Sequence, residues 1–185
     1  MNIYQTHPTF ITPRFTLRLV EADDAPGLLS VYSDRQAQAY FNADNCTSNF
    51  RYTTLRQMQE CVDMWIHARR QGWFMRWVIL EKELYVGTVE MFRQSDGPDG
   101  QGRGVLRMDV LSRKEFEDVF DELLRTMLPG LHDMFGCREI VTKAPRFAIQ
   151  RQTALRWHGF VPLEKPLEGK DGRMLPDYWV RRASK

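Results

Sequence analysis

The sequence has little net charge, few cysteines and no long apolar run. Its 185 residues carry 26 Lys and Arg against 24 Asp and Glu, which leaves a formal charge of +2. Proteins that bind nucleic acids or anionic membranes through bulk electrostatics usually carry a marked basic excess. No apolar stretch approaches the roughly 18 residues that a membrane-spanning helix needs. We therefore expect neither a nucleic-acid partner nor a membrane partner.

The three cysteines, Cys46, Cys61 and Cys137, are scattered, odd in number and without C-x-x-C spacing. This pattern indicates neither a disulfide framework nor a zinc site. The first residues lack the basic and apolar regions of a secretory signal. Together these absences predict a reduced protein of the cytoplasm without a metal ion.

Motifs of several enzyme classes are also missing. There is no G-x-S-x-G of serine hydrolases, no H-E-x-x-H of zincins and no Walker loop. The sequence is 43% hydrophobic and 12% aromatic, which suits a globular chain that buries roughly two thirds of its unfolded surface. A run of turn-forming residues from Gln94 to Gly104 predicts an exposed hairpin loop, because strand patterns lie on both sides of it. We expect residues 1–185 to form a single domain.

Periodic apolar patterns predict strands and helices in a definite order. One strand is followed by two helices, a three-stranded meander, a helix, a strand, a helix and a closing hairpin. Pro129-Gly130 is expected to kink or break the third helix. The predicted strands are 15–20, 74–80, 84–92, 105–111, 139–142, 160–163 and 178–182. The first predicted helix follows the capping carboxylates of 21–24 and carries Leu28, Leu29, Val31 and Tyr32 on one face, and the others lie near 53–70, 116–131 and 147–157.

This order resembles that of the GNAT superfamily of acetyl-CoA-dependent N-acetyltransferases over nearly the whole chain. The segment Thr12-Pro13-Arg14-Phe15-Thr16-Leu17-Arg18, followed by Asp23-Asp24-Ala25, is similar to the opening of the branch that acetylates ribosomal-protein N-termini and some antibiotics. The resemblance implies an α/β (α+β) GNAT fold, with a mixed, mostly antiparallel sheet of six to seven strands and about four helices. Further matches to that branch are Val86-Gly87-Thr88-Val89, Gly159-Phe160, Lys170-Asp171-Gly172 and Asp177-Tyr178.

The resemblance also implies a site for acetyl-CoA. In the family, the strand equivalent to 105–111 splays from its neighbour and lends backbone groups to the pantetheine arm. The following turn and helix start should hold the pyrophosphate, because free N–H groups at a helix N-terminus attract anions. The cofactor-binding residues implied in this way are Met108, Val110, Arg113, Lys114, Phe116, Asp118, Val119, Phe120 and Arg151.

The chain departs from the family pattern at this site. The motif Q-x-x-G-x-G/A aligns with residues 115–120, where neither glycine is present. Ala148, Arg151 and Leu155 stand where the family usually has Asn, Ser and Tyr. Gln101-Gly102-Arg103-Gly104 looks like a truncated phosphate loop, but it precedes a strand rather than a helix, which favours a hairpin loop. Five carboxylates also fall near the expected pyrophosphate, namely Glu115, Glu117, Asp118, Asp121 and Glu122.

These acids have two interpretations. A carboxylate about 6 Å from a phosphate charge costs about 3 kcal/mol at an effective dielectric near 20, which weakens cofactor binding. Alternatively, acids in a first helical turn complement the helix dipole and are solvated. Arg151 has two interpretations as well, a contact to a cofactor phosphate or an exposed arginine on a solvated helix face.

Acetyl transfer to an amine requires a general base. Glu90 and Asp109 interrupt apolar strands and are the candidate catalytic residues, with a solvent-facing strand acid as the alternative. The sequence thus supports an N-acetyltransferase that uses acetyl-CoA and acts on a small-molecule amine or a protein N-terminus, as a monomer or homodimer. The alternative is an inactive GNAT-fold binding or regulatory protein that has lost acetyl-CoA binding.

Overall fold

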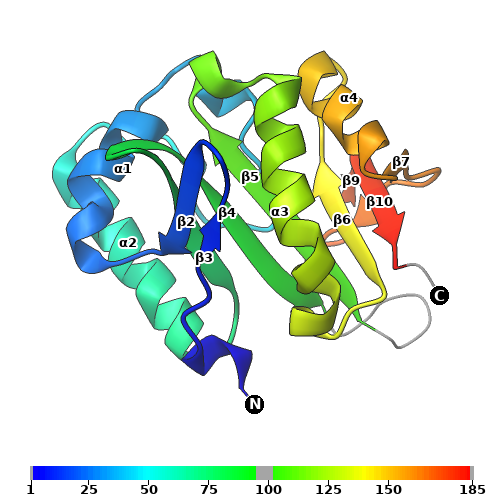
Figure 1. The fold of residues 1–185 in the computed structure, drawn as a ribbon, viewed down its shortest axis with the longest axis horizontal. Coiled ribbons are helices and arrows are strands. Elements are labelled where there is room, and N and C mark those ends of the chain that lie inside the picture. The colour runs from blue at the N-terminus through cyan, green and yellow to red at the C-terminus, as the bar shows by residue number, and fades with distance from the viewer. Residues whose placement is uncertain (1, 95–101, 184–185) are drawn as a thin grey trace.

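The computed structural model describes residues 2–94 and 102–183. An eight-stranded sheet of order β1-β2-β3-β4-β5-β6-β10-β7 runs through the molecule, and β5–β6 is its parallel pair (Figure 1). The strands of this sheet are β1 (Phe10–Ile11), β2 (Phe15–Leu19), β3 (Met75–Glu81), β4 (Leu84–Gln94), β5 (Arg103–Val110), β6 (Glu139–Lys143), β7 (Val161–Pro162) and β10 (Tyr178–Arg182); β8 (Leu167–Glu168) and β9 (Met174–Leu175) form a separate hairpin.

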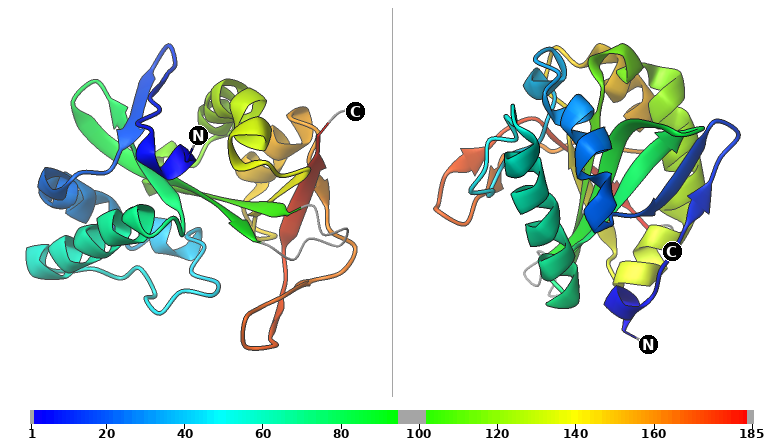
Figure 2. Two further views of the ribbon diagram at one scale, coloured as in Figure 1. Left: turned by 90° about the horizontal axis from the view of Figure 1, so that it is seen from below. Right: turned by 90° about the vertical axis from the view of Figure 1, so that its left-hand side faces the viewer.

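In the part of the chain that the structure describes, four α-helices flank the sheet, two on each face (Figure 2). Helices α1 (Ala25–Tyr32) and α2 (Leu55–Arg70) cover one face, and α3 (Glu117–Phe135) and α4 (Ile149–Trp157) cover the other. Each helix buries an apolar stripe; α3, for example, buries Phe120, Leu124 and Leu131. Among the described residues, no helix is long and apolar enough to cross a membrane.

The predicted fold class is confirmed. All seven predicted strands form, and the sheet reaches eight because the two-residue strand β1 adds an edge beside β2. Residues 95–101 of the predicted hairpin loop lie outside the described residues, although its ends pair as Gln94 with Arg103. Of the kink or break predicted at Pro129-Gly130, the break is wrong, because α3 continues through Pro129 to Phe135. Buried side chains on both sides of Pro129 anchor the helix to the sheet and offset the lost backbone hydrogen bond.

Strands β5 and β6 separate towards their carboxyl ends. Their register runs from Arg103–Glu139 to Leu106–Thr142 and then stops. The β4–β5 register continues further, to Gly87–Val110. Met108 and Val110 therefore lie beyond the last β5–β6 pair, on the side where the two strands splay.

Gly87 lets β4 approach β5 closely beside this splay. A Cβ atom on Gly87 would lie 2.3 Å from the Asp109 carbonyl oxygen and 2.9 Å from the Val110 Cα. Because both are backbone atoms in a paired strand, we expect Gly87→Ala to lower the free energy of unfolding by about 1–3 kcal/mol. Urea denaturation measures this change.

Gly130 in α3 provides the matched control. A Cβ there would have no neighbour within 4 Å. Gly130→Ala should therefore stabilise the protein by about 0.4–1 kcal/mol, since alanine restricts the unfolded chain. Equal effects of the two substitutions would contradict the close approach at Gly87.

Candidate functional site

The splay between β5 and β6 opens beside two helix N-termini. Helices α3 and α4 both begin at the carboxyl ends of these strands and lie next to each other (Figure 1). The Glu117 N–H donates to Gln150 Oε1 at 3.3 Å, which joins the first residue of α3 to α4. Leu111 N–H donates to Val86 O, so strand alternation directs the backbone groups of Met108 and Val110 away from β4, towards the splay.

A buried ion pair joins α4 to the turn before α3, beside the splay. Arg151 Nε and Nη2 donate to the two Glu115 carboxylate oxygens at 2.7 and 2.9 Å, and their side chains are 1% and 5% exposed. The Arg151 guanidinium also stacks on the Phe120 ring at 4.7 Å and reaches the Tyr40 carbonyl at 3.4 Å. The interpretation of Arg151 as an exposed arginine is therefore wrong. Its side chain is buried, and its charge is paired with Glu115, 36 residues away in the sequence.

Cations of this chain neutralise most of the other acids near the start of α3. Arg14 pairs with both Asp118 and Glu122, at 2.6 and 2.5 Å. Asp121 accepts from His158 at 2.9 Å and also pairs with Arg125. The acids are thus mostly ion-paired rather than simply solvated, and they repel an approaching anion less than the sequence suggests.

On the opposite face, a ladder of charged side chains crosses three strands. Arg76, Glu90 and Arg107 stand at paired positions of β3, β4 and β5, and all three are buried. Arg76 binds one Glu90 oxygen, and Arg107 Nη1 donates to the other at 2.6 Å. Burial opposes ionisation of Glu90, but the two guanidinium groups outweigh it and hold the pKa of Glu90 below its usual range.

Asp109 lies one rung along the same face in a different environment. It is 1% exposed and accepts hydrogen bonds from the Tyr32 hydroxyl at 3.2 Å and the Asn42 N–H at 3.4 Å. Arg76 Nη1 lies 3.7 Å away. Burial raises the pKa of Asp109 above its ordinary value, because nearby arginines only partly compensate for it.

The polar network continues across the splay to β10. Asn42 Nδ2 donates to the Tyr178 hydroxyl at 3.1 Å, and that hydroxyl donates to Asp44 Oδ2 at 3.2 Å. Lys143 Nζ, at the end of β6, donates to the same Asp44 oxygen at 2.7 Å. Residues 42–44 thus join the two halves of the sheet.

A cavity of about 260 Å³ opens over the Arg76–Glu90–Arg107 ladder. We call it the aromatic cavity, because most of its apolar wall consists of Phe and Trp side chains. Its wall comes from α2, strands β3 to β5, the segment 45–50 and the turn that joins β8 to β9. The lining residues are Asn45, Cys46, Thr47, Ser48, Phe50, Met64, Trp65, Trp73, Phe74, Arg76, Glu90, Phe92, Gln94, Arg107 and Lys170.

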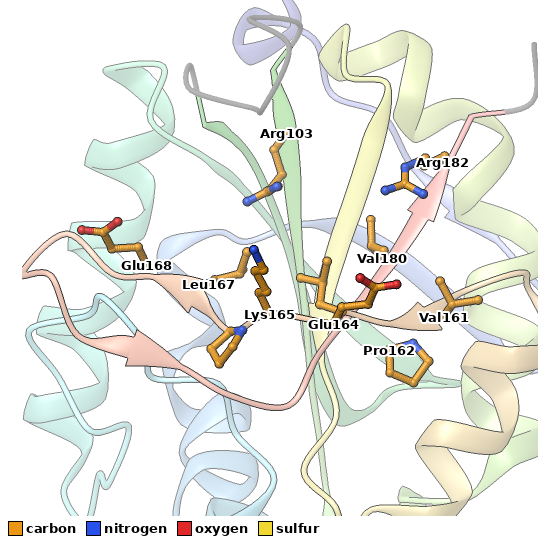
Figure 3. Close-up of a pocket in the computed structure, with 11 residues that line it drawn as sticks. Arg103, Val161, Pro162, Glu164, Lys165, Leu167, Glu168, Val180 and Arg182 are labelled. Carbon is orange, nitrogen blue, oxygen red and sulfur yellow. The ribbon is translucent and has the colours of Figure 1, made fainter.

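A second hollow, of about 420 Å³, lies at the other end of β5 and β6. Figure 3 shows Arg103 and Lys165 pointing into it, with Glu164 and Arg182 nearby. Arg103 pairs with Glu139 in the first rung of the β5–β6 register. This hollow therefore adjoins the closed end of the strand pair and is remote from the splay.

The predicted cofactor residues fall into distinct environments. The side chains of Met108, Val110, Val119 and Phe120 are buried, and the N–H groups of Val119 and Phe120 already donate to the Phe116 carbonyl. Only the backbone atoms of Met108 and Val110 are left for a ligand in the splay. Arg113 is exposed, and Phe116 is 53% exposed. Lys114 pairs with Glu81 at 2.6 Å, and Asp118 pairs with Arg14. The structure thus brings Met108, Val110 and Arg151 to the gap and commits Lys114 and Asp118 to other partners.

Sequence reasoning missed the polar partners of the candidate acids. Arg76 lies in the run 74–80, and Tyr32 lies on an apolar helix face, so both looked like ordinary strand and core positions. Asn42 lies in a segment with no periodic pattern. The one available signal was that Arg76 and Arg107 each interrupt an apolar strand, as Glu90 and Asp109 do.

Comparisons with known proteins identify the architecture. Neither a protein-family model nor a curated protein sequence matches the chain. A ribosomal-protein-S5-alanine acetyltransferase from Vibrio fischeri superposes with a TM-score of 0.69 at 15% identity, over 94% of each chain.

Two other solved structures are similar. One is a Salmonella typhimurium acetyltransferase that modifies the N-terminal serine of the 50S protein L7/L12, with a TM-score of 0.67 at 12% identity over 96% of this chain and 100% of the other. The other is the microcin C7 self-immunity acetyltransferase MccE in complex with acetyl-CoA and AMP, with a TM-score of 0.71 at 7% identity over 92% and 93%. The chain has the fold of the GNAT acetyltransferases.

Proposed function

We propose that this chain is an N-acetyltransferase that moves the acetyl group of acetyl-CoA to a primary amine on a small molecule or a protein N-terminus. The observation that carries the proposal is the splay of β5 from β6 beside the N-termini of α3 and α4. Structures with the same fold include an acetyltransferase in complex with acetyl-CoA. We further propose that residues 1–185 act as one domain in the cytoplasm, as a monomer or homodimer.

The residues at the splay fit acetyl-CoA. The backbone groups of Met108 and Val110 face the gap and are suited to hydrogen-bond the pantetheine amides. Arg113, which is exposed just before α3, supplies a positive charge for the pyrophosphate. Bound there, acetyl-CoA supplies an activated acyl group as a thioester.

The catalytic step needs a base for the incoming ammonium group. We assign this role to Asp109, since a raised pKa brings a carboxylate closer to the strength that a general base requires near neutral pH. It takes a proton from the ammonium, and the freed amine forms the C–N bond as the C–S bond breaks. The new amide nitrogen loses its surplus proton, and the departing thiolate takes that proton to leave as a thiol. Both Glu90 oxygens are bound by arginines, so Glu90 serves to position Arg76 and Arg107.

The aromatic cavity is the proposed acceptor site. Glu90, Arg76 and Arg107 form part of its lining, and Arg76 is within 3.7 Å of Asp109. An amine bound in the cavity would approach the base from the α1/α2 face. Acetyl-CoA in the splay would approach from the other side of β5.

Calorimetric titration with acetyl-CoA tests the proposal. We expect saturable binding with a micromolar dissociation constant. Arg113→Ala should weaken it roughly three- to tenfold, because the substitution removes one charge-assisted contact to phosphate. Arg56→Ala, at an exposed arginine of α2 whose side chain is 88% accessible, is the control and should leave the affinity unchanged.

The Glu115–Arg151 pair favours a second candidate, an inactive GNAT-fold binding or regulatory protein. The pair fills part of the gap with the chain's own side chains. Absence of heat and of any thermal shift at millimolar acetyl-CoA would reject the enzyme and favour this candidate. Recovery of binding in the double variant Glu115→Gln/Arg151→Ser would then identify the pair as the obstacle.

A further inference from the structure

The aromatic cavity offers more hydrogen-bond donors than acceptors. Arg107 is 7% exposed, and its Nε–H has no partner among the described residues. The indole N–H of Trp65, another lining residue, is likewise buried and unpaired among those residues. Arginines already engage both oxygens of Glu90, the carboxylate of the lining. A ligand that brings acceptor oxygens would therefore complement this lining.

The net charge of the lining also favours an anionic ligand. The lining contains Arg76, Arg107 and Lys170 against Glu90, and Asp109, which lies 3.7 Å from Arg76 just outside the lining, reduces the excess to one positive charge. Arg76 and Arg107 are buried, so solvent screens their field weakly. A polyamine or another dication would meet this field unfavourably, whereas an anion would be attracted.

The apolar side chains of the cavity wall favour a ligand with an apolar group of limited size. Phe50, Phe74 and Phe92 line the cavity, and Trp73 and Met64 are 59% and 44% exposed lining residues. A volume of about 260 Å³ lies just below the roughly 300–1,000 Å³ typical of drug-sized ligands. The space therefore suits one amino-acid-sized molecule with an aromatic or bulky apolar group.

We propose that the acceptor is a small amine with an aromatic or apolar body that also carries a carboxylate. The inference rests on the proposed function, because it takes the aromatic cavity to be the acceptor site. The carboxylate pairs with Arg76, Arg107 or Lys170, and the apolar body packs against the Phe and Trp side chains of the cavity. The amine is left unpaired and is available for acetylation.

Binding of three matched probes without acetyl-CoA tests this specificity. The probes are 3-phenylpropanoate, 3-phenylpropanamide and 3-phenylpropylammonium, which share the aromatic body and differ in charge. By calorimetry we expect the carboxylate to bind at least about tenfold more tightly than the amide, and the ammonium to bind most weakly. Lys170→Gln should reduce the preference for the carboxylate over the amide.

Substitution of two tryptophans of nearly equal exposure tests whether the probes bind in the aromatic cavity. Trp73 lines the cavity and is 59% exposed, whereas Trp157 at the end of α4 is 60% exposed and is not a lining residue. Trp73→Ala should weaken 3-phenylpropanoate roughly fivefold or more, and Trp157→Ala should leave it unchanged. Both side chains are on the surface, so neither substitution disturbs the core.

Three outcomes would overturn the inference. The first is that 3-phenylpropanamide binds as tightly as 3-phenylpropanoate or more tightly. The second is that no probe binds at about 10 mM, an order-of-magnitude upper limit on the dissociation constant for a site of this size. The third is that Trp73→Ala and Trp157→Ala change the affinity for 3-phenylpropanoate equally. None of them bears on acetyl-CoA, whose binding is measured separately. Failure of this inference is therefore distinct from failure of the proposed activity.

Discussion

Replacement of Glu90 by glutamine is expected to lower the free energy of unfolding by about 3–5 kcal/mol, the usual cost of breaking a buried ion pair from one side. Glu90 is 2% exposed and is the carboxylate that binds both Arg76 and Arg107. The amide would leave the buried Arg107 guanidinium without a carboxylate partner, and Arg76 with only the longer contact to Asp109. For a chain of this size the melting temperature should fall by roughly 6–20 °C.

The control is Glu60→Gln, which breaks an exposed pair one helical turn apart with Arg56. It should change stability by about 0.5 kcal/mol or less. The pKa of Glu90 is lowered from 4.5, so its contribution is present above pH 4.5 and is lost as the pH falls through the lowered folded value. The gap between wild type and Glu90→Gln should narrow below pH 4.5, and equal denaturation midpoints for the two variants at pH 7 would refute the ladder.

Replacement of Asp109 by asparagine is expected to reduce the rate of acetyl transfer by roughly 10²–10⁴-fold, the range typical of a lost general base. The wild-type rate should fall as the pH drops through the raised pKa of Asp109, and this limb should be absent from the variant. Steady-state rates across pH, measured with acetyl-CoA and an acetylatable amine, provide the test. The control Asp63→Asn, at an exposed position of α2, should retain full activity.

The thermal stability of Asp109→Asn shows whether a loss of activity comes from the missing base or from a disturbed fold. Because the folded pKa of Asp109 is raised above 3.8, its ionisation costs stability, and the cost grows as the pH rises from 3.8 through the folded value. The asparagine side chain of Asp109→Asn would carry no charge, so the variant should melt no lower than wild type at pH 7. An inactive variant that also melts far below wild type would argue for a structural role instead.

Much of the fold could be predicted because local patterns and tertiary packing agree. Alternation in 15–20 and continuous apolar runs in 74–80 and 84–92 correspond to strands whose faces are buried in the expected way. The helix does not break at Pro129, the second of the two outcomes predicted there, because buried residues on both sides hold it and the local rule counts only the lost hydrogen bond. The edge strand β1 is only two residues long, too short for a periodic signal.

The site was less predictable, because its geometry depends on contacts distant in sequence. Glu90 and Asp109 could be singled out as acids that interrupt apolar strands. The different hydrogen-bond partners of the two acids could not be predicted. Tyr32 lies 77 residues from Asp109 in the sequence, and Asn42 lies in a segment without a periodic pattern. Arg151 is similar, because a helix-face arginine looks solvent-exposed until the chain brings Glu115 to it.

The segment 42–46 has a consequence for ligand binding. At one end Asn42 contacts Asp109 and Tyr178 across the splay, and at the other end Cys46 belongs to the wall of the aromatic cavity. A donor molecule that shifts this segment on entering the splay must also reshape the mouth of the cavity. By thermodynamic reciprocity, the factor by which the donor changes affinity for the acceptor equals the factor by which the acceptor changes affinity for the donor. Any shift of these five residues on donor binding would thus make the two binding equilibria of the proposed acetyltransferase interdependent.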